Sequence, residues 1–185
     1  MKIYLAGPDV FLPDARALGA AKKDICARHG LVGLFPLDGG DDAPDPDVRS
    51  LAMQIFRSCT RMMAEADAII AHLTPFRGPS ADAGTVFELG WMAARGRLCA
   101  GYSNRRGDYA GRIAGAAPDG CVLRDGNGHL VEDFGLVDNL MIAHALAAFG
   151  QPVLTPDGEE PGDPFRDLTL FGRCVEWIAG HAGAP

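Results

Sequence analysis

The sequence lacks the glycine-rich loops with which α/β proteins usually bind nucleotide phosphates. No G-x-G-x-x-G follows the first predicted strand, and no Walker loop occurs. The sequence therefore contains no motif that would indicate binding of a dinucleotide or a nucleoside triphosphate. The sequence also has no apolar run long enough to cross a bilayer, no signal peptide before the first strand and no internal repeat. We therefore expect a cytoplasmic protein without a membrane partner.

The cysteines are too scattered for a zinc-binding protein, and the basic residues are too scattered for a nucleic-acid-binding protein. The five cysteines are odd in number, widely spaced and without a CxxC pair, so we expect reduced, packed thiols and no metal site. Seventeen Lys and Arg against 24 Asp and Glu give a net charge of -7. Because binding to nucleic-acid phosphates needs clustered basic residues, this balance argues against a nucleic-acid polymer as partner.

The 185 residues, 48% of them hydrophobic, are enough for a single domain with a full core over residues 1–185. Apolar spacing predicts strands at 2–6, 31–35, 67–73 and 97–103, helices at 13–29, 48–66, 82–95, 138–149 and 165–179, and a hairpin at 121–131. This alternation predicts an α/β fold with a doubly wound parallel sheet. Ligands of such sheets bind beyond the carboxyl ends of the strands.

Two predicted helices have an expected inner face. The first should bury Ala17, Ala20, Ala21 and Ile25, and the second Leu51, Ile55, Met62 and Met63. Residues 36–47 between them hold three prolines, two glycines and five aspartates, so they form a loop. This loop is either a solvated acidic segment or a cover over a ligand.

Glu88 lies in an apolar helical segment, where a carboxylate is costly unless something compensates. Gly84 shares its helix face and leaves room over the carboxylate. Tyr4 is either a core aromatic or a hydroxyl that bonds to Glu88, and Asp82 is either an N-cap or a hydrogen-bond acceptor or proton donor to a ligand. Gly7 lets backbone or ligand approach closely. Two carboxylates beside one pocket are typical of glycosidic chemistry.

Further candidates lie near the same edge of the sheet. Asp138 is a natural N-cap, and Asn139 could present its amide to a sugar hydroxyl. Arg77 either contacts a ligand or stays in solvent, and His72 is treated as structural although it lies near this edge. The aromatic residues that are either pocket walls or core are Phe11, Phe76 and Trp91.

Four segments carry a family resemblance: YLAGPDVF at 4–11, ADAIIA at 66–71, DAGTVFELG at 82–90 and DNLM at 138–141. Together, and in this order, they resemble the nucleoside 2-deoxyribosyltransferases. The resemblance implies a flavodoxin-like sheet of about five parallel strands and a role in nucleotide salvage, with purines among the bases; a purine-only and a broad base specificity both stay open. It also implies transfer of 2-deoxyribose from a 2′-deoxynucleoside donor to a free nucleobase acceptor, without metal or organic cofactor.

The resemblance also implies roles for individual residues. Glu88 matches the nucleophile, which forms a covalent deoxyribosyl-enzyme and so retains configuration. Tyr4 matches the tyrosine that bonds the nucleophile, and Asp82 the aspartate that contacts the base. Asn139 and Met141 match residues that a neighbouring subunit of a homo-oligomer contributes, the asparagine binding the sugar.

One position departs from the family pattern. Many members carry an aspartate or asparagine eight residues before the position of Asp67, near the base, and Cys59 stands there in this chain. Two rival functions stay open. A related branch hydrolyses deoxynucleoside 5′-monophosphates, but a carboxylate at Asp82 should repel a phosphate, which favours a free nucleoside. The other rival is a non-catalytic nucleoside- or nucleotide-sensing module on the same fold.

Overall fold

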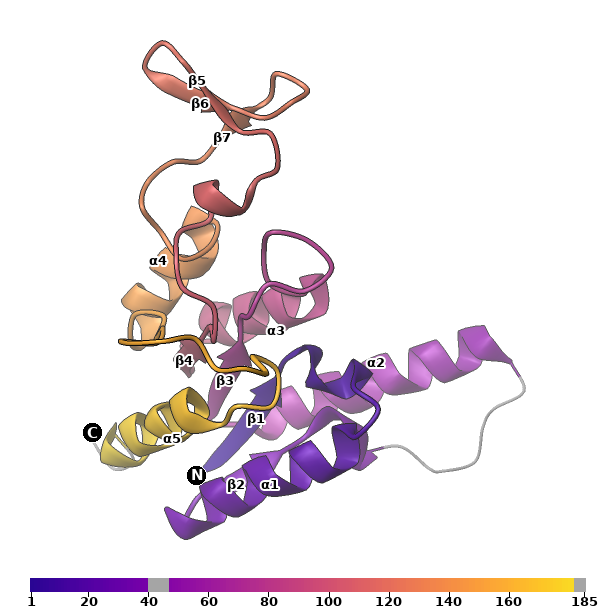
Figure 1. The fold of residues 1–185 in the computed structure, drawn as a ribbon. Coiled ribbons are helices and arrows are strands. Elements are labelled where there is room, and N and C mark those ends of the chain that lie inside the picture. The colour runs from indigo at the N-terminus through magenta and orange to yellow at the C-terminus, as the bar shows by residue number, and fades with distance from the viewer. Residues whose placement is uncertain (40–46, 182–185) are drawn as a thin grey trace.

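The computed structural model describes residues 1–39 and 47–181. Its central sheet has four parallel strands in the order β2-β1-β3-β4: β1 (Lys2–Ala6), β2 (Val32–Leu34), β3 (Ala68–His72) and β4 (Leu98–Tyr102) (Figure 1). This order is the start of the flavodoxin-like order. The predicted α/β, doubly wound fold is therefore confirmed, with four regular strands among the described residues instead of about five.

An irregular segment lies along the outer edge of β4, where the flavodoxin-like strand order has its fifth strand. Gly150 and Leu154 form isolated parallel bridges with Cys99 and Tyr102 of β4. A side chain at Gly150 would place its Cβ only 1.6 Å from the carbonyl oxygen of Cys99. Glycine is therefore what allows this segment to lie so close to the sheet, although the segment is too irregular to count as a strand.

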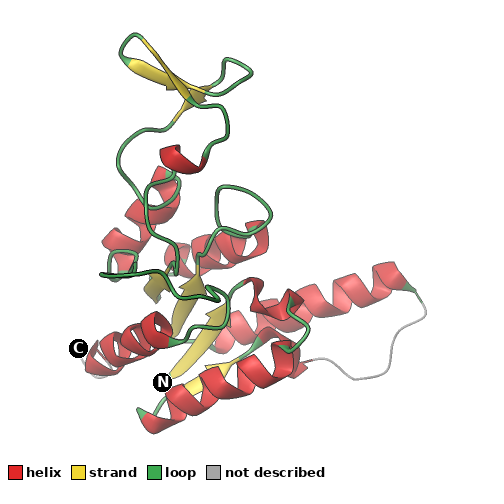
Figure 2. Ribbon diagram, viewed as in Figure 1, coloured by secondary structure: helices red, strands yellow, loops and turns green. Residues whose placement is uncertain are grey.

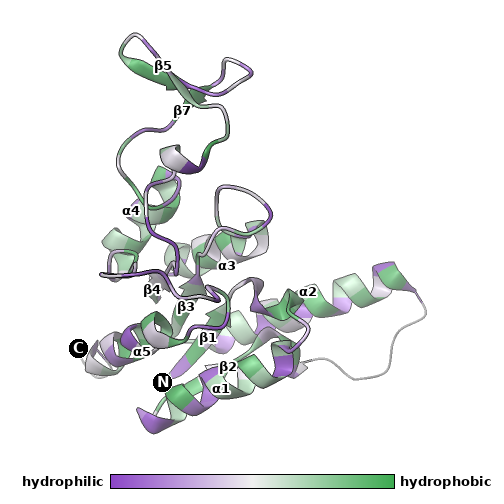
Figure 3. Ribbon diagram, in the orientation of Figure 1, coloured by the Kyte–Doolittle hydropathy of each residue, from purple (hydrophilic) through white to green (hydrophobic). Residues whose placement is uncertain are grey.

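Helices cover both faces of the sheet (Figures 1 and 2). One face packs against α1 (Ala15–Arg28) and α5 (Thr169–His181), and the other against α2 (Val48–Glu65), α3 (Ala83–Ala94) and α4 (Leu140–Phe149). Alternate residues of β1 serve the two cores: Ile3 and Leu5 face α1 and α5, whereas Tyr4 and Ala6 face the other three helices. Figure 3 shows the apolar character of the central strands and of α4.

The expected inner faces of α1 and α2 are partly wrong. On α1 the buried residues are Ala15, Leu18, Gly19, Lys22 and Cys26. Of the predicted set, Ile25 is partly buried and packs against the core, Ala21 is partly buried, and Ala17 and Ala20 are exposed. The reason is Lys22, which is buried because Asp9 pairs with it, so a charged residue marks the inner face. On α2 only Met62 and Met63 are buried, and Ile55 is 53% exposed.

A small antiparallel sheet stands apart from the central one (Figure 2). It contains β5 (Ala117–Asp119), β6 (Val122–Arg124) and β7 (Leu130–Val131). The predicted hairpin over 121–131 is confirmed as β6 and β7, whereas β5 was missed. Short 3-10 helices span Pro8–Phe11, Pro36–Gly39 and Ala110–Arg112.

Residues 40–46 of the predicted acidic loop, interpreted as a solvated segment or a ligand cover, lie outside the described residues. Among the helices that are described, none combines the length and the apolar character needed to span a bilayer.

Candidate active site

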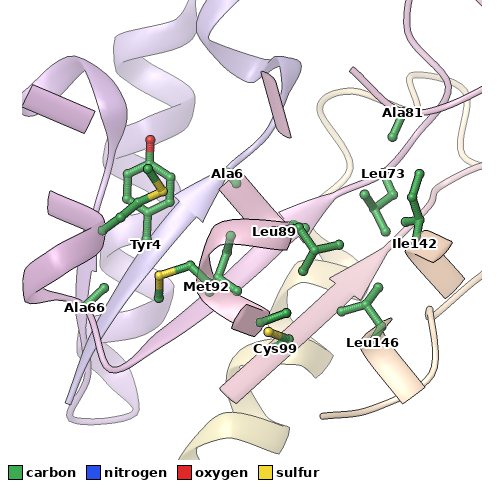
Figure 4. Packing of buried hydrophobic residues seen from close by; sticks show 14 of the residues in the cluster. Tyr4, Ala6, Ala66, Leu73, Ala81, Leu89, Met92, Cys99, Ile142 and Leu146 are labelled. Atoms are coloured by element: carbon green, nitrogen blue, oxygen red, sulfur yellow. The ribbon is translucent and has the colours of Figure 1, made fainter. Parts of the chain in front are cut away.

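Glu88 and Tyr4 are joined by a hydrogen bond on the side of the sheet covered by α2 and α3. Tyr4 Oη donates to Glu88 Oε1 at 2.6 Å. Tyr4 is fully buried, and Figure 4 shows its ring standing between β1 and the helices with the hydroxyl at its outer end. Leu89 and Met92, the buried face of α3, anchor the helix that carries Glu88. Packing of α3 thus holds the carboxylate against the tyrosine.

The environment of Glu88 shifts its protonation. Burial raises the pKa of this carboxyl group, the hydrogen bond from Tyr4 opposes the rise, and the charge of Asp82 adds to it, so that the pKa lies at about 7. Burial, together with the adjacent Glu88, raises the pKa of the Tyr4 hydroxyl well above its usual value, so Tyr4 stays a donor. The carboxylate is therefore poorly solvated and only partly ionised at neutral pH.

Asp82 is the N-cap of α3. Its Oδ2 accepts a hydrogen bond from the Thr85 backbone N–H at 3.1 Å. Its Oδ1 makes no hydrogen bond within the described residues, so one carboxylate oxygen remains available at the cavity wall. A Cβ on Gly84 would lie 3.0 Å from Oδ2, so glycine keeps this wall open. The capping and ligand-facing interpretations of Asp82 are therefore compatible.

The backbone at Gly7 packs directly against two buried side chains, which leaves no room for a larger residue. A Cβ there would lie 2.5 Å from Asp9 Oδ2 and 2.8 Å from His72 Cβ, so any side chain would clash. The sequence predicted that backbone or ligand would approach Gly7 closely. The groups that do so are buried side chains, and Gly7 also lines the cavity.

The buried side chains beneath Gly7 form an ionic cluster that the sequence did not predict. Lys22 Nζ donates to Asp9 Oδ2 at 2.5 Å, and Asp9 Oδ1 lies 2.9 Å from His72 Nδ1. His72 Nε2 lies 2.7 Å from Thr74 Oγ1, which accepts from the backbone N–H of Asn104. Burial favours the neutral acid at Asp9, but Lys22 and His72 outweigh it and hold the Asp9 pKa well below its usual range. Burial lowers the pKa of His72.

A cavity of about 940 Å³ opens beside Glu88. This lies in the upper part of the range of about 300–1,000 Å³ that holds small ligands. The cavity brings together most of the predicted site residues, namely Gly7, Phe11, Asp82, Gly84 and Glu88, and also Cys59. They come from the end of β1, from α2 and from α3, which meet at the carboxyl edge of the sheet.

Phe11 is the aromatic residue of the predicted set that lines the cavity, and it is 52% exposed. Its ring stacks on Phe76 with centroids 5.5 Å apart, and the Arg77 guanidinium carbon lies 4.8 Å from the Phe11 centroid. Among the described residues that line the cavity, Arg77, Phe76 and Trp91 do not appear. Arg77, held at a φ of 57°, therefore supports Phe11 from outside the cavity.

Asn139 and Met141 lie apart from Glu88. Both line a second cavity of about 650 Å³, together with Ser80 and Ala81. The Asn139 amide donates to Glu132 at 2.9 Å, and its Oδ1 accepts from the Met141 backbone N–H at 3.0 Å. Asn139 is thus the N-cap of α4. Within one chain, these residues do not reach the cavity of Glu88.

Asp138 was expected to cap α4, and this prediction is wrong. It is buried, and its carboxylate accepts from the Ala81 backbone N–H at 2.9 Å and from the Ser80 hydroxyl. A carboxylate that ties the loop before α3 to the segment before α4 satisfies these donors and leaves the cap to the next residue.

Sequence reasoning missed the basic part of the cavity. Arg57 and Arg61 of α2 and Arg16 of α1 line it. The signal that could have found the pair on α2 is its spacing of four residues around Cys59, which places both on one helix face. Grouped His, Cys, Asp or Glu side chains able to hold a metal ion do not occur in residues 1–39 and 47–181.

The structure defines an α/β protein with a cavity of small-ligand size at the carboxyl edge of a parallel sheet, beside a largely buried glutamate that accepts a hydrogen bond from a tyrosine. The sequence model of the family described as nucleoside 2-deoxyribosyltransferase matches residues 3–141. The chain therefore belongs to the nucleoside 2-deoxyribosyltransferase family.

Solved structures agree with this assignment. A 2-deoxyribosyltransferase of Leishmania mexicana is 30% identical, with a TM-score of 0.65 and coverage of 97% of each chain. A 2-deoxyribosyltransferase of Bacillus psychrosaccharolyticus is 18% identical, with a TM-score of 0.52 over 79% of this chain and 82% of that one, and shows the shared fold. An uncharacterized protein of Schizosaccharomyces pombe is 38% identical over 104 residues, 55% of this chain, and the match spans 49% of that protein.

Proposed function

We propose that this protein transfers 2-deoxyribose between nucleobases of 2′-deoxynucleosides, with Glu88 as the nucleophile. The observation that carries the proposal is the hydrogen bond between Tyr4 and the half-buried Glu88 on the wall of a nucleoside-sized cavity. Family membership supports the same reaction. The reaction needs neither metal nor organic cofactor, because the carboxylate itself supplies the bonding electrons.

In the first step the Glu88 oxygen that does not accept from Tyr4 bonds to C1′ of the donor. The C1′–N bond breaks, and the base leaves with its electron pair and takes up a proton. The free oxygen of Asp82 lies on the same cavity wall and can contact the base. An acceptor base then attacks C1′ from the vacated side, loses its N–H proton, which balances the proton taken up by the first base, and frees the carboxylate, so two inversions retain the configuration.

The absence of a 2′-hydroxyl on the donor suits this chemistry. A 2′-hydroxyl withdraws electrons from the oxocarbenium-like transition state and crowds the attacking carboxylate, so 2-deoxy sugars react faster. Exclusion of water matters as well, because water in place of the acceptor base would turn transfer into hydrolysis.

We further propose that the working form is a homo-oligomer in which a second copy supplies Asn139 to the site. This is supported by the position of Asn139 and Met141, which line a separate cavity in their own chain, and by the 70% exposure of Met141. The asparagine would bind a sugar hydroxyl of the neighbour's substrate.

Base exchange tests the proposed function. Wild type, Glu88→Ala and Glu88→Gln are incubated with 2′-deoxyadenosine and hypoxanthine, and 2′-deoxyinosine is quantified by chromatography. We expect exchange by wild type and a loss of several orders of magnitude in both variants. No exchange by wild type, with intact binding by Glu88→Ala, would identify a sensing module. Release of base from the 5′-monophosphate without exchange would identify the hydrolase.

A further inference from the structure

Two arginines on α2 form a positively charged strip on the wall of the Glu88 cavity. Arg57 and Arg61 are four residues apart on one helix face, both are exposed, and both line the cavity. Neither forms an ion pair with a carboxylate within residues 1–39 and 47–181. Glu65, one turn beyond Arg61, pairs with Lys2 at 2.9 Å, and Arg61 acts on it only through the charge that helps Lys2 to lower its pKa. Their guanidinium donors therefore remain available to a ligand in the cavity.

These arginines do not serve the nucleophile. The groups that set the pKa of Glu88 are its own buried surroundings, Tyr4 and Asp82, and a guanidinium in contact would lower that pKa instead of leaving it near 7. The cavity is therefore polarised: its α3 wall carries the carboxylates of Asp82 and Glu88, and its α2 wall carries the two guanidinium groups.

The positions of Glu88 and of the two arginines on different walls of the cavity determine which part of a substrate can contact the arginines. In the proposed reaction C1′ lies at Glu88 and the base contacts Asp82, so the deoxyribose and one edge of the base would lie on the α3 side. The far edge of the base or the 5′ end of the sugar would then extend toward α2. Cys59, two residues from each arginine and on another face of α2, packs near Tyr4 and also lines the cavity. It adds no charge that would offset the arginines at neutral pH, because burial raises the pKa of its thiol. A group that reaches the α2 wall thus meets hydrogen-bond donors and positive charge.

Resting on the proposed function, we propose that Arg57 and Arg61 determine specificity by binding a negatively polarised oxygen of the substrate. Guanidinium groups bind such oxygens, often with two hydrogen bonds, and offer no acceptor to an amino group. Two substituents carry this chemistry: the keto oxygen of a base such as hypoxanthine, and a phosphate on the 5′ carbon of the sugar. When the C1′–N bond breaks, the departing base keeps the electron pair, and a keto group spreads this charge onto the oxygen beside the arginines.

Four donors distinguish the two sources of oxygen. These are 2′-deoxyadenosine, 2′-deoxyinosine and the 5′-monophosphate of each, assayed for release of base in wild type and in the double variant Arg57→Gln/Arg61→Gln. We expect kcat/KM of the double variant to fall by about tenfold to a hundredfold for donors that carry the recognised oxygen, as for loss of a charged hydrogen bond. For 2′-deoxyadenosine we expect a change below about twofold. Arg57→Lys/Arg61→Lys should restore part of the loss.

Arg49→Gln is the matched control, because Arg49 is an exposed arginine of the same helix outside the cavity lining. It should leave all four values unchanged. A loss confined to 2′-deoxyinosine and its monophosphate assigns the arginines to the base, and a loss confined to the two monophosphates assigns them to the phosphate. Changes below twofold for all four donors, or an equal loss for all four, would overturn the proposal.

Binding measurements distinguish a failure of this proposal from a failure of the proposed function. Dissociation constants of the four donors are measured by calorimetry on Glu88→Gln, with and without the two arginine substitutions. If wild type shows no turnover, the proposed function fails, yet a tenfold or larger weakening confined to oxygen-bearing donors still supports recognition by the arginines. Equal affinities in both proteins would overturn that recognition even where turnover is normal.

Discussion

Replacing Tyr4 by phenylalanine should move the pH dependence of catalysis in a direction that the structure fixes. The Tyr4 hydroxyl donates to Glu88 Oε1 at 2.6 Å and so favours the ionised carboxylate. Glu88 already has a pKa of about 7, raised chiefly by burial. If Glu88 attacks as a carboxylate, kcat/KM of wild type should rise through an acidic limb near this pH.

The size of the shift follows from the strength of the bond. A hydrogen bond to a charged group contributes about 1.5–3 kcal/mol, and about 1.4 kcal/mol corresponds to one pKa unit. Tyr4→Phe should therefore raise the acidic limb by about one to two units. At pH 7 the ionised fraction of Glu88 then falls from about one half to between roughly 1% and 10%, with a matching loss in kcat/KM.

The assay is kcat/KM for base release between pH 5 and about 9.5. Tyr102→Phe is the matched control, since its hydroxyl is buried on the other face of the sheet and has no hydrogen-bond partner among the described residues. That variant should keep the wild-type profile. A deficit of Tyr4→Phe that persists at high pH measures the orienting effect of the bond. An acidic limb that stays in place or moves to lower pH would refute the reasoning.

Three further predictions concern stability and assembly. Lys22→Met leaves the buried Asp9 carboxylate unpaired and should lower the free energy of unfolding by about 3–5 kcal/mol in urea titrations; a loss below about 1 kcal/mol would contradict the ionic cluster. Glu88→Gln should stabilise the protein above pH 7 by at most about 3 kcal/mol. Because folding raises the pKa of Glu88, the wild-type protein loses stability as pH rises from 4.5 through about 7, and the variant does not. In thermal denaturation the gain should vanish near pH 4.5, and an equal gain at both pH values would argue against a desolvated carboxylate. Mixed oligomers of Glu88→Ala and Asn139→Ala should recover part of the wild-type activity, whereas an inactive mixture would exclude a shared site.

Much of the site could be read from the sequence because it depends on local patterns. Apolar spacing defined β1 and α3, and the parallel sheet then brought Tyr4 to Glu88 at its carboxyl edge. Gly84 sharing a helix face with Glu88 follows from helix geometry alone. The elements and the place of the site need only periodicity and one topological rule, whereas the bond between Tyr4 and Glu88 was one of two alternatives until the family resemblance implied it.

The features of the fold and site that the sequence did not predict depend on contacts between residues far apart in the chain. The burial of Lys22 could not be predicted, because nothing in its neighbourhood in the sequence shows that Asp9 pairs with it inside the core. Asp138 was expected to cap a helix, because its binding of the loop before α3 spans 57 residues. Such pairings change which residues are buried without changing the local pattern.

The central claim is that Glu88 bonds covalently to the sugar during the reaction. The most direct measurement is mass spectrometry of wild-type enzyme quenched in acid after mixing with a 2′-deoxynucleoside in the absence of acceptor base. The account predicts a burst of free base and one deoxyribosyl group on the peptide that contains Glu88, with Tyr102→Phe giving the same adduct. Turnover without any adduct, or an adduct on another side chain, would contradict it.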